Sequence, residues 1–158
     1  MADALLYALA AESFPPPLKP EFGAAVVKAY LSKAQVPADG LVLENGSGLS
    51  RITRISARTM SSLLLHAHRS PYMPEFLASL SLSGLDGTMR NRFRHAPESG
   101  RMHLKTGHLN DVAAVAGYVL AASGKTYVVT LLVNHPTANH GGGSQLINAL
   151  LSWTYQLR

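Results

Sequence analysis

Apolar residues in the first half of the chain recur at helical spacing and predict four amphipathic helices. The first helix ends at the proline run 15–17, because proline cannot donate to the helical hydrogen-bond ladder. The second covers about residues 22–33, the third starts near Ser56 and is closed by Pro71, and a short fourth starts near Pro74. The positions expected to face the interior are Leu5, Leu6, Leu9, Phe22, Val26, Val27, Tyr30, Leu31, Met60, Leu63, Leu64, Ala67, Phe76, Leu77 and Leu80.

The second half of the chain has the alternation of β-strands. Residues 102–107 place Lys105 on the face opposite Leu104, because successive side chains of a strand point to opposite faces. Two Val-rich runs, 112–122 and 126–134, flank the small polar stretch 123–125 and predict a β-hairpin.

Two further elements complete the expected fold. Residues 40–51 predict a short strand that runs into the glycine-rich turn Asn45-Gly46-Ser47-Gly48. A last helix is expected from about Ser144, with Leu146, Leu150 and Trp153 as its buried stripe. Helices followed by a strand meander and a closing helix indicate an α+β layered fold, and 158 residues suit a single domain over residues 1–158.

The composition is that of a globular protein with a basic surface. Hydrophobic residues make up 47% and charged residues 15%, and 14 Lys and Arg against 9 Asp and Glu give a net charge of +5. This charge favours anionic partners without choosing among them. No cysteine is present, which excludes disulfides and thiolate metal sites. His66 and His68 diverge on a helix, so no metal site and no cofactor are predicted.

The N-terminal stretch resembles a secretory signal only in its apolar run. Asp3 precedes it and the earliest basic residue is Lys19, whereas a signal peptide needs a basic start, so a helix is the interpretation. No apolar run reaches the roughly 18 residues of a membrane span.

The tripeptide Lys105-Thr106-Gly107 is the strongest chemical candidate. An ammonium and a hydroxyl can hold a carboxylate, and a glycine lets a substrate backbone lie against the strand. By itself such a short motif occurs often by chance, and a solvated lysine at a strand end explains it equally well.

Three stretches in order give the motif its context: "ENGSGLSR", "LDGTMRNR" and "LKTGHLNDVAAVAGYVLAASGK". Together they resemble the penicillin-binding protein 4 type (class C) D-alanyl-D-alanine carboxypeptidase/endopeptidases, in the C-terminal portion of that family. Its members typically show D-G-S-G-L-S-R, then D-G-S/T with an arginine four residues later, here Arg92, and then K-T-G on the strand that lines the active site. This chain departs from the D-G-S-G-L-S-R pattern, because Glu44 and Asn45 stand where the family has its aspartate. The turn 45–48 is therefore interpreted as structural.

The resemblance implies a β-lactamase/transpeptidase-like fold, in which the antiparallel sheet is packed by N-terminal helices and a C-terminal helix. It implies that Lys105, Thr106 and Gly107 bind the terminal carboxylate of a peptidoglycan stem peptide or a β-lactam, and that the backbone N–H of His108 is one oxyanion-hole donor. It also implies hydrolysis through an acyl-enzyme, and a periplasmic or extracytoplasmic location for full-length members.

The family's S-x-x-K nucleophile and S-x-N relay match no serine of this chain. The resemblance places both in a portion preceding Met1, so the activity of the isolated chain is doubtful.

Three other hypotheses stay open at this point. The first is a non-catalytic module that binds stem peptide or a cell-wall partner. The second is a fragment that folds poorly alone. The third is a nucleic-acid-binding protein that uses Arg90, Arg92, Arg94 and His95, but with Phe93 as the only interleaved aromatic residue a solvated connector is preferred, and no nucleic-acid partner is predicted.

Overall fold

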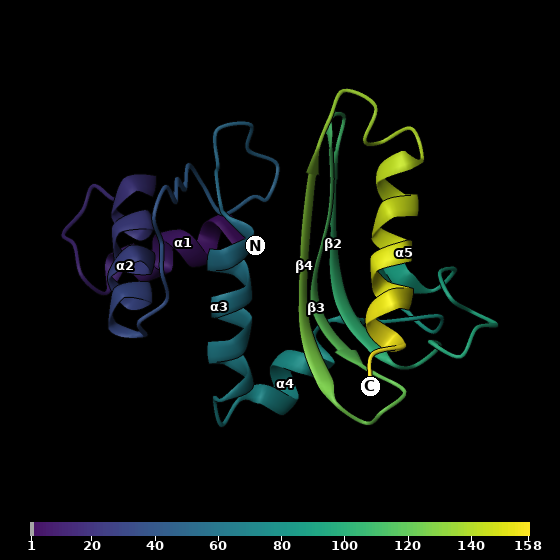
Figure 1. Ribbon diagram of the computed structural model, residues 1–158. Helices are drawn as coiled ribbons and strands as arrows, with labels where there is room; N and C mark the ends of the chain where they lie inside the picture. Colours follow the sequence, from purple (N-terminus) through teal and green to yellow (C-terminus); the bar gives the residue numbers. More distant parts are fainter. Residues whose placement is uncertain (1) are drawn as a thin grey trace. The chain divides into compact units, whose positions relative to one another are not determined.

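A computed structural model describes residues 2–158, which divide into two compact units at residues 66 and 67 (Figure 1). The sheet is antiparallel and the helices precede and follow it, so the α+β prediction is confirmed. The elements are α1 (Ala2–Ala11), α2 (Pro20–Lys33), α3 (Ala57–His68), α4 (Met73–Ala78), β1 (Ser81–Leu82), the 3₁₀ turn η1 (Gly87–Met89), β2 (Met102–Leu109), β3 (Val112–Leu120), β4 (Thr126–Asn134) and α5 (Gly142–Tyr155).

The first unit has a small hydrophobic core of its own. Leu31 at the end of α2 packs with Val36 and Leu41 from the following loop. Ser56 begins α3 as a side-chain cap, because its Oγ accepts the Thr59 N–H at 3.0 Å. The short strand predicted within residues 40–51 is wrong: its backbone forms a single isolated bridge, between Val42 and Arg54.

The predicted buried faces of the early helices are correct only in part. Leu6 and Leu31 are buried, but Leu5 is 66% and Tyr30 54% exposed, and Leu9 is 44% exposed. The α1 face that packs inward is set by Leu6 and the fully buried Ala10, four residues on, so the apolar stripe is narrower than the leucine pattern indicates.

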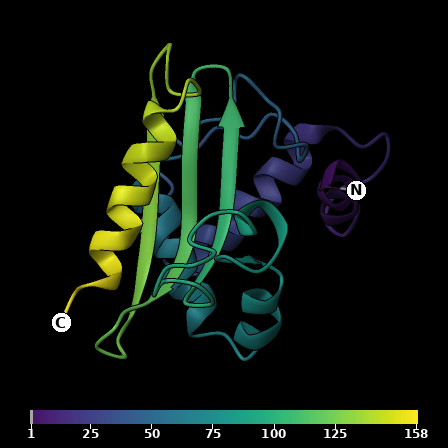
Figure 2. The ribbon, with the colours of Figure 1, turned by 90° about the vertical axis from the view of Figure 1, so that its right-hand side faces the viewer.

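The second unit is built on the four-stranded sheet, in the order β1-β2-β3-β4, and Figure 2 shows its long strands β2, β3 and β4 side by side. The predicted hairpin is confirmed, with Leu120 opposite Thr126 at its turn. β3 also pairs with β2 along the whole length of β2, from Met102 opposite Val119 to Leu109 opposite Val112. β1 was not predicted, because two residues are too few to show an alternation.

Helix α5 lies along one face of the sheet, but with a different stripe from the one predicted (Figures 1 and 2). Ile147 and Leu151 are fully buried in the core, whereas Leu146 and Trp153 are 54% and 59% exposed. Leu150, the third residue of the predicted stripe, is partly buried against the core, so the prediction is correct there and wrong at Leu146 and Trp153. The buried row starts at Gly143, where a Cβ would come within 2.7 Å of the Ala113 Cβ, so only this row lets the helix approach the sheet.

The short helix α4 also differs from its prediction. None of its residues is buried, and Phe76 is 37% exposed. The rings of Phe76 and Tyr118 are perpendicular, with 6.4 Å between their centroids, on the sheet face opposite α5. The helix also meets β2, where its Leu77 carbonyl lies 3.1 Å from His103 Nδ1, but four of its six residues are exposed.

Candidate functional site: the open edge of β2

Strand β2 carries the Lys105-Thr106-Gly107 tripeptide, and its side chains alternate as predicted. Met102, Leu104 and Thr106 are buried, whereas Lys105 is exposed on the other face. The buried set packs in the core beneath α5. Lys105 and Thr106 are therefore adjacent in sequence but project from opposite faces of the strand.

One edge of β2 is covered by β1 over only a short distance. β1 pairs with His103 and Leu104, and within the described residues no strand pairs with this edge from Lys105 onward. The Met102 carbonyl accepts the Ser83 N–H at 2.9 Å on this edge. Because backbone groups alternate between the two edges of a strand, the N–H and C=O groups of Thr106 and His108 face the same open edge.

The Lys105 ammonium also reaches this edge. Its Nζ donates to the Thr106 carbonyl oxygen at 2.6 Å, so the side chain folds over the strand toward the side that the carbonyl faces. The charge therefore lies at the Thr106 carbonyl, and the His108 N–H faces the same edge two residues, about 7 Å, further along the strand. A cation and an outward N–H on one unpaired edge form a site that suits an anionic, extended ligand.

The hydroxyl of Thr106 is held by the D-G-T segment. It donates to the Thr88 Oγ1 at 2.9 Å, across 18 positions of sequence. Thr88 is positioned by η1, where its own N–H donates to the Ser81 Oγ at 3.3 Å. The D-G-T segment and the Lys105-Thr106-Gly107 tripeptide, which are separate in the sequence, are thus joined by the hydrogen bond between these two hydroxyl groups. Only the order of motifs in the family resemblance pointed to Thr88, and no periodicity could have found this contact.

Gly107 is accommodated in ordinary strand conformation. A Cβ placed on it would lie 3.5 Å from the Ala114 Cβ, an ordinary contact, so the fold itself does not require glycine here. The absence of a side chain instead leaves this position of the strand open.

Arg92 is the arginine that follows the D-G-T segment. Its Nε donates to the Asn148 Oδ1 at 2.9 Å and its Nη2 donates to the same oxygen, which fastens the connector to α5. Burial of the guanidinium lowers the pKa of Arg92 from its ordinary value. The carboxylate of Glu98 is buried and accepts the Ser152 hydroxyl, also on α5, at 2.8 Å; no sequence pattern indicates this contact.

The remaining sequence candidates are not brought to the edge of β2. The turn 45–48 lies in the first unit, where Gly46 donates its N–H to the Asp3 carboxylate at 2.8 Å. His66 is hydrogen-bonded to the Tyr30 hydroxyl at 3.0 Å, and His103 Nδ1 lies 3.1 Å from the Leu77 carbonyl oxygen. Among the residues that the structure describes, no group of three His, Asp or Glu side chains could hold a metal ion. No helix of residues 2–158 has the length and apolarity to cross a membrane.

The sequence matches the D-Ala-D-Ala carboxypeptidase 3 (S13) family over residues 1–157. The chain belongs to this family. The family prediction made from the three motifs is thus confirmed, and with it the membership of this S13 chain in a group of peptide hydrolases.

Relatives of this S13 chain agree with the assignment. It is 37% identical over 108 residues to a D-alanyl-D-alanine carboxypeptidase of an Actinomadura species, an alignment that covers 65% of this chain and 20% of the relative. It is 28% identical over 136 residues to the carboxypeptidase DacB of Haemophilus influenzae, covering 85% of this chain and 28% of that protein. The chain therefore spans less than a third of the length of these relatives.

A solved structure confirms the fold of this S13 chain. The crystal structure of Haemophilus influenzae penicillin binding protein 4 (dacB), complexed with a β-lactam, superposes with a TM-score of 0.89 at 25% identity. The superposition covers 99% of this chain and 38% of that protein, so the penicillin-binding protein 4 type fold predicted from the sequence is confirmed.

Proposed function

We propose that this chain forms the carboxylate-binding and oxyanion side of a serine-type D-Ala-D-Ala carboxypeptidase/endopeptidase site that takes peptidoglycan stem peptides. The observation that carries the proposal is the open edge of β2, where the Lys105 ammonium folds onto the Thr106 carbonyl and the His108 N–H faces outward two residues further on. Both units are proposed to belong to one transpeptidase-like domain that acts outside the cytoplasmic membrane, with β-lactams as mimics of the substrate.

The bound peptide lies against this edge in an extended conformation. Its terminal carboxylate pairs with the Lys105 ammonium, and Gly107 leaves space for the peptide backbone. The Thr106 hydroxyl has one proton, which it donates to Thr88 in this structure. When the carboxylate binds, Thr88 becomes the donor in this pair, so that the Thr106 proton turns to the ligand.

The reaction is an acyl transfer. A serine hydroxyl attacks the carbonyl carbon of the penultimate D-alanine, the peptide C–N bond breaks, and the terminal D-alanine leaves with a proton. Water then hydrolyses the resulting ester and releases the shortened peptide and the serine. Negative charge on the carbonyl oxygen is stabilised by the His108 N–H. The attacking serine comes from outside these 158 residues, because none of the serines here stands three positions before a lysine.

Binding to the edge is tested by NMR titration of the chain with an N-acetylated D-Ala-D-Ala peptide. We expect saturable shifts at the amides of Thr106, Gly107 and His108, and none with the L-Ala-L-Ala peptide. Lys105→Met removes the ammonium and should weaken binding about tenfold or more, since a charge-assisted contact contributes about 1.5 to 3 kcal/mol. His108→Ala is the matched control and should bind as the parent does, because it keeps the backbone N–H. Equal binding by Lys105→Met would overturn the assignment.

A second candidate is a non-catalytic module that binds stem peptide or a cell-wall partner, favoured by the same open edge and by the net charge of +5. Fluorescent penicillin separates the two. The 158-residue chain should take no covalent label, whereas a longer protein from the same gene region should be labelled if the site is catalytic. A longer protein that binds the peptide but is never labelled would favour the module, and labelling of the 158-residue chain would show that its nucleophile is present here.

A further inference from the structure

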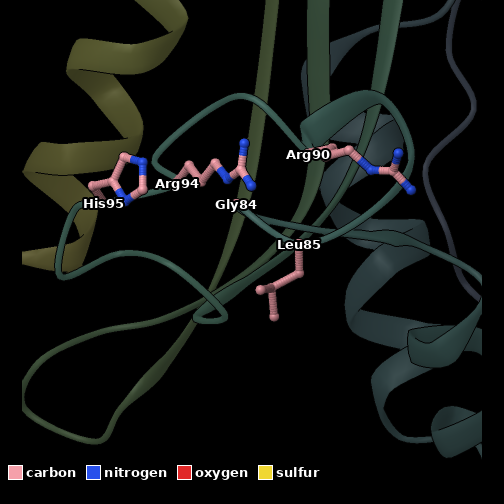
Figure 3. Close-up of a pocket in the computed structure, with 5 residues that line it drawn as sticks. All are labelled: Gly84, Leu85, Arg90, Arg94 and His95. Carbon is pink, nitrogen blue, oxygen red and sulfur yellow. The ribbon is translucent and has the colours of Figure 1, made fainter.

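A concave surface is formed by residues of the segment between β1 and β2, on both sides of η1. It is a depression of about 420 Å³, lined by Gly84, Leu85, Arg90, Arg94 and His95 (Figure 3). This volume is within the range of about 300 to 1,000 Å³ that small-molecule sites have. We name it the connector pocket.

The two arginines of the connector pocket have no anionic partner among the described residues. Both are exposed, and neither side chain makes a hydrogen bond or an ion pair there. The nearest carboxylates in sequence are engaged elsewhere: Asp86 accepts the Leu82 N–H at 2.6 Å, and Glu98 accepts the Ser152 hydroxyl. Neither Arg90 nor Arg94 is therefore paired with a carboxylate among the described residues, so both guanidinium groups are available to an anionic ligand.

The backbone of the pocket is fixed rather than loose. Gly84 has a φ of +73°, and a Cβ on it would lie 2.5 Å from the Ser99 Oγ and 3.1 Å from the Arg94 Cα, so the two walls are in contact. Phe93 has a φ of +65°, which is uncommon for a residue with a side chain. Its ring packs against the main core, which turns the next residue, Arg94, outward. A strained, anchored turn that presents a cation is typical of functional sites.

The layout of the side chains indicates the shape of the ligand. Figure 3 shows Arg94 between His95 and Gly84, whereas Arg90 extends from the far side of Gly84 with its guanidinium directed away from Arg94. Two separated guanidinium groups suit two anionic groups on an extended ligand better than a single ion. The planar guanidinium group of arginine donates paired hydrogen bonds to phosphate and carboxylate oxygens.

We propose that the connector pocket binds a linear chain of phosphate groups, with Arg90 and Arg94 each contacting a different phosphate. Single-stranded nucleic acid is a poorer match, because binding of its bases relies on aromatic stacking and the pocket lining has no Phe, Tyr or Trp. The site is independent of the function proposed for the β2 edge, and Lys105→Met should leave it unchanged.

Titration of the 158-residue chain with tripolyphosphate at low salt, followed by NMR, tests the pocket. We expect saturable shifts centred on Gly84, Leu85, Arg94 and His95, which disappear as salt is raised. Arg90→Gln and Arg94→Gln should each weaken binding about tenfold, and the double variant about a hundredfold. Arg69→Gln removes an exposed arginine of the same unit outside the pocket and is the matched control. Affinity unchanged in the double variant, or lost equally in Arg69→Gln, would refute the proposal.

Two further ligands identify the source of the phosphates. A glycerol phosphate oligomer that binds more tightly than tripolyphosphate indicates a polyol-phosphate polymer, and the reverse order indicates free polyphosphate; either supports the pocket. An oligothymidylate of equal charge should bind no more tightly than these. If it binds about tenfold tighter, bases contribute to recognition and the proposed ligand class is wrong.

Discussion

The hydroxyl pair between Thr106 and Thr88 allows a sharp test of how the D-G-T segment supports the β2 strand. Thr88→Val keeps the shape of the side chain but removes the acceptor of the 2.9 Å hydrogen bond. Thr106 is only 7% exposed, so its hydroxyl is left largely without a replacement partner. Leaving a buried hydroxyl unpaired costs about 1 to 3 kcal/mol, and because Thr88 itself is exposed, we expect the lower part, about 1 to 2 kcal/mol.

The assay is thermal and urea unfolding of four proteins: the parent, Thr88→Val, Thr106→Val and the double variant. A loss of this size lowers the Tm by about 2 to 8 °C for a chain of this length. Removing both hydroxyls leaves no polar group unpaired, so the double variant should be clearly more stable than the sum of the single losses predicts. Thr88→Ser keeps the oxygen and is expected within about 0.5 kcal/mol of the parent.

Additive losses would refute this reasoning. If the free energies of unfolding of the single variants add to within about 0.3 to 0.5 kcal/mol in the double variant, the two hydroxyls are not coupled and the contact is incidental. Under the proposed function, Thr88→Val should also weaken D-Ala-D-Ala peptide binding, while Thr88→Ser should not.

Three further predictions concern packing, a buried carboxylate and pH. Ile147→Ala should lower the free energy of unfolding by about 2 to 5 kcal/mol, because the Ile147 side chain is fully buried. Leu146→Ala should lower it by less than about 1 kcal/mol, because Leu146 is 54% exposed. Equal losses in urea unfolding would contradict the buried row assigned to α5. Ser152→Ala removes the donor to the buried Glu98 carboxylate and should cost about 1 to 3 kcal/mol, measured in the same way, with Ser152→Thr retaining part of it. Burial raises the pKa of Tyr118 above its ordinary value of 10.0, so the unfolded chain loses this proton first and the free energy of unfolding should fall as the pH rises past 10. Tyr118→Phe should make the free energy of unfolding less dependent on pH in this range. An unchanged pH dependence in that variant would contradict the prediction.

The sequence predicted an element correctly where its pattern of apolar and polar residues is compatible with only one buried face. The alternation at Met102, Leu104 and Thr106 allows one buried face for β2, so the exposed position of Lys105 followed directly. The hairpin was equally clear, because two apolar runs flank a short polar stretch. Helix α5 was ambiguous, since the rows through Leu146 and through Ile147 both have helical spacing. The choice between them depends on the close approach at Gly143, which is a tertiary contact.

The candidate site is a prediction from the sequence, and its geometry could not be derived from the sequence. A tripeptide and a family resemblance pointed to Lys105, Thr106 and Gly107, yet neither could show that the ammonium folds over the strand toward the Thr106 carbonyl. The open edge depends on where β1 stops, and β1 is two residues long. Strand pairing of that kind depends on long-range contacts, such as the hydrogen bond between Ser83 and Met102, which leave no local pattern.

The basic connector shows why counting charges in a sequence overstates a binding surface. Arg90, Arg92 and Arg94 alternate as if they formed one cationic stripe, but the segment is a turn rather than a strand. Arg92 is drawn inward by Asn148 on α5, so its charge serves to hold the connector in place and is partly desolvated. The two outward arginines are thereby held on a rigid base, with Phe93 anchored in the core between Arg92 and Arg94. Arg92 therefore fastens the segment that carries the connector pocket to α5, while Arg90 and Arg94 stay exposed.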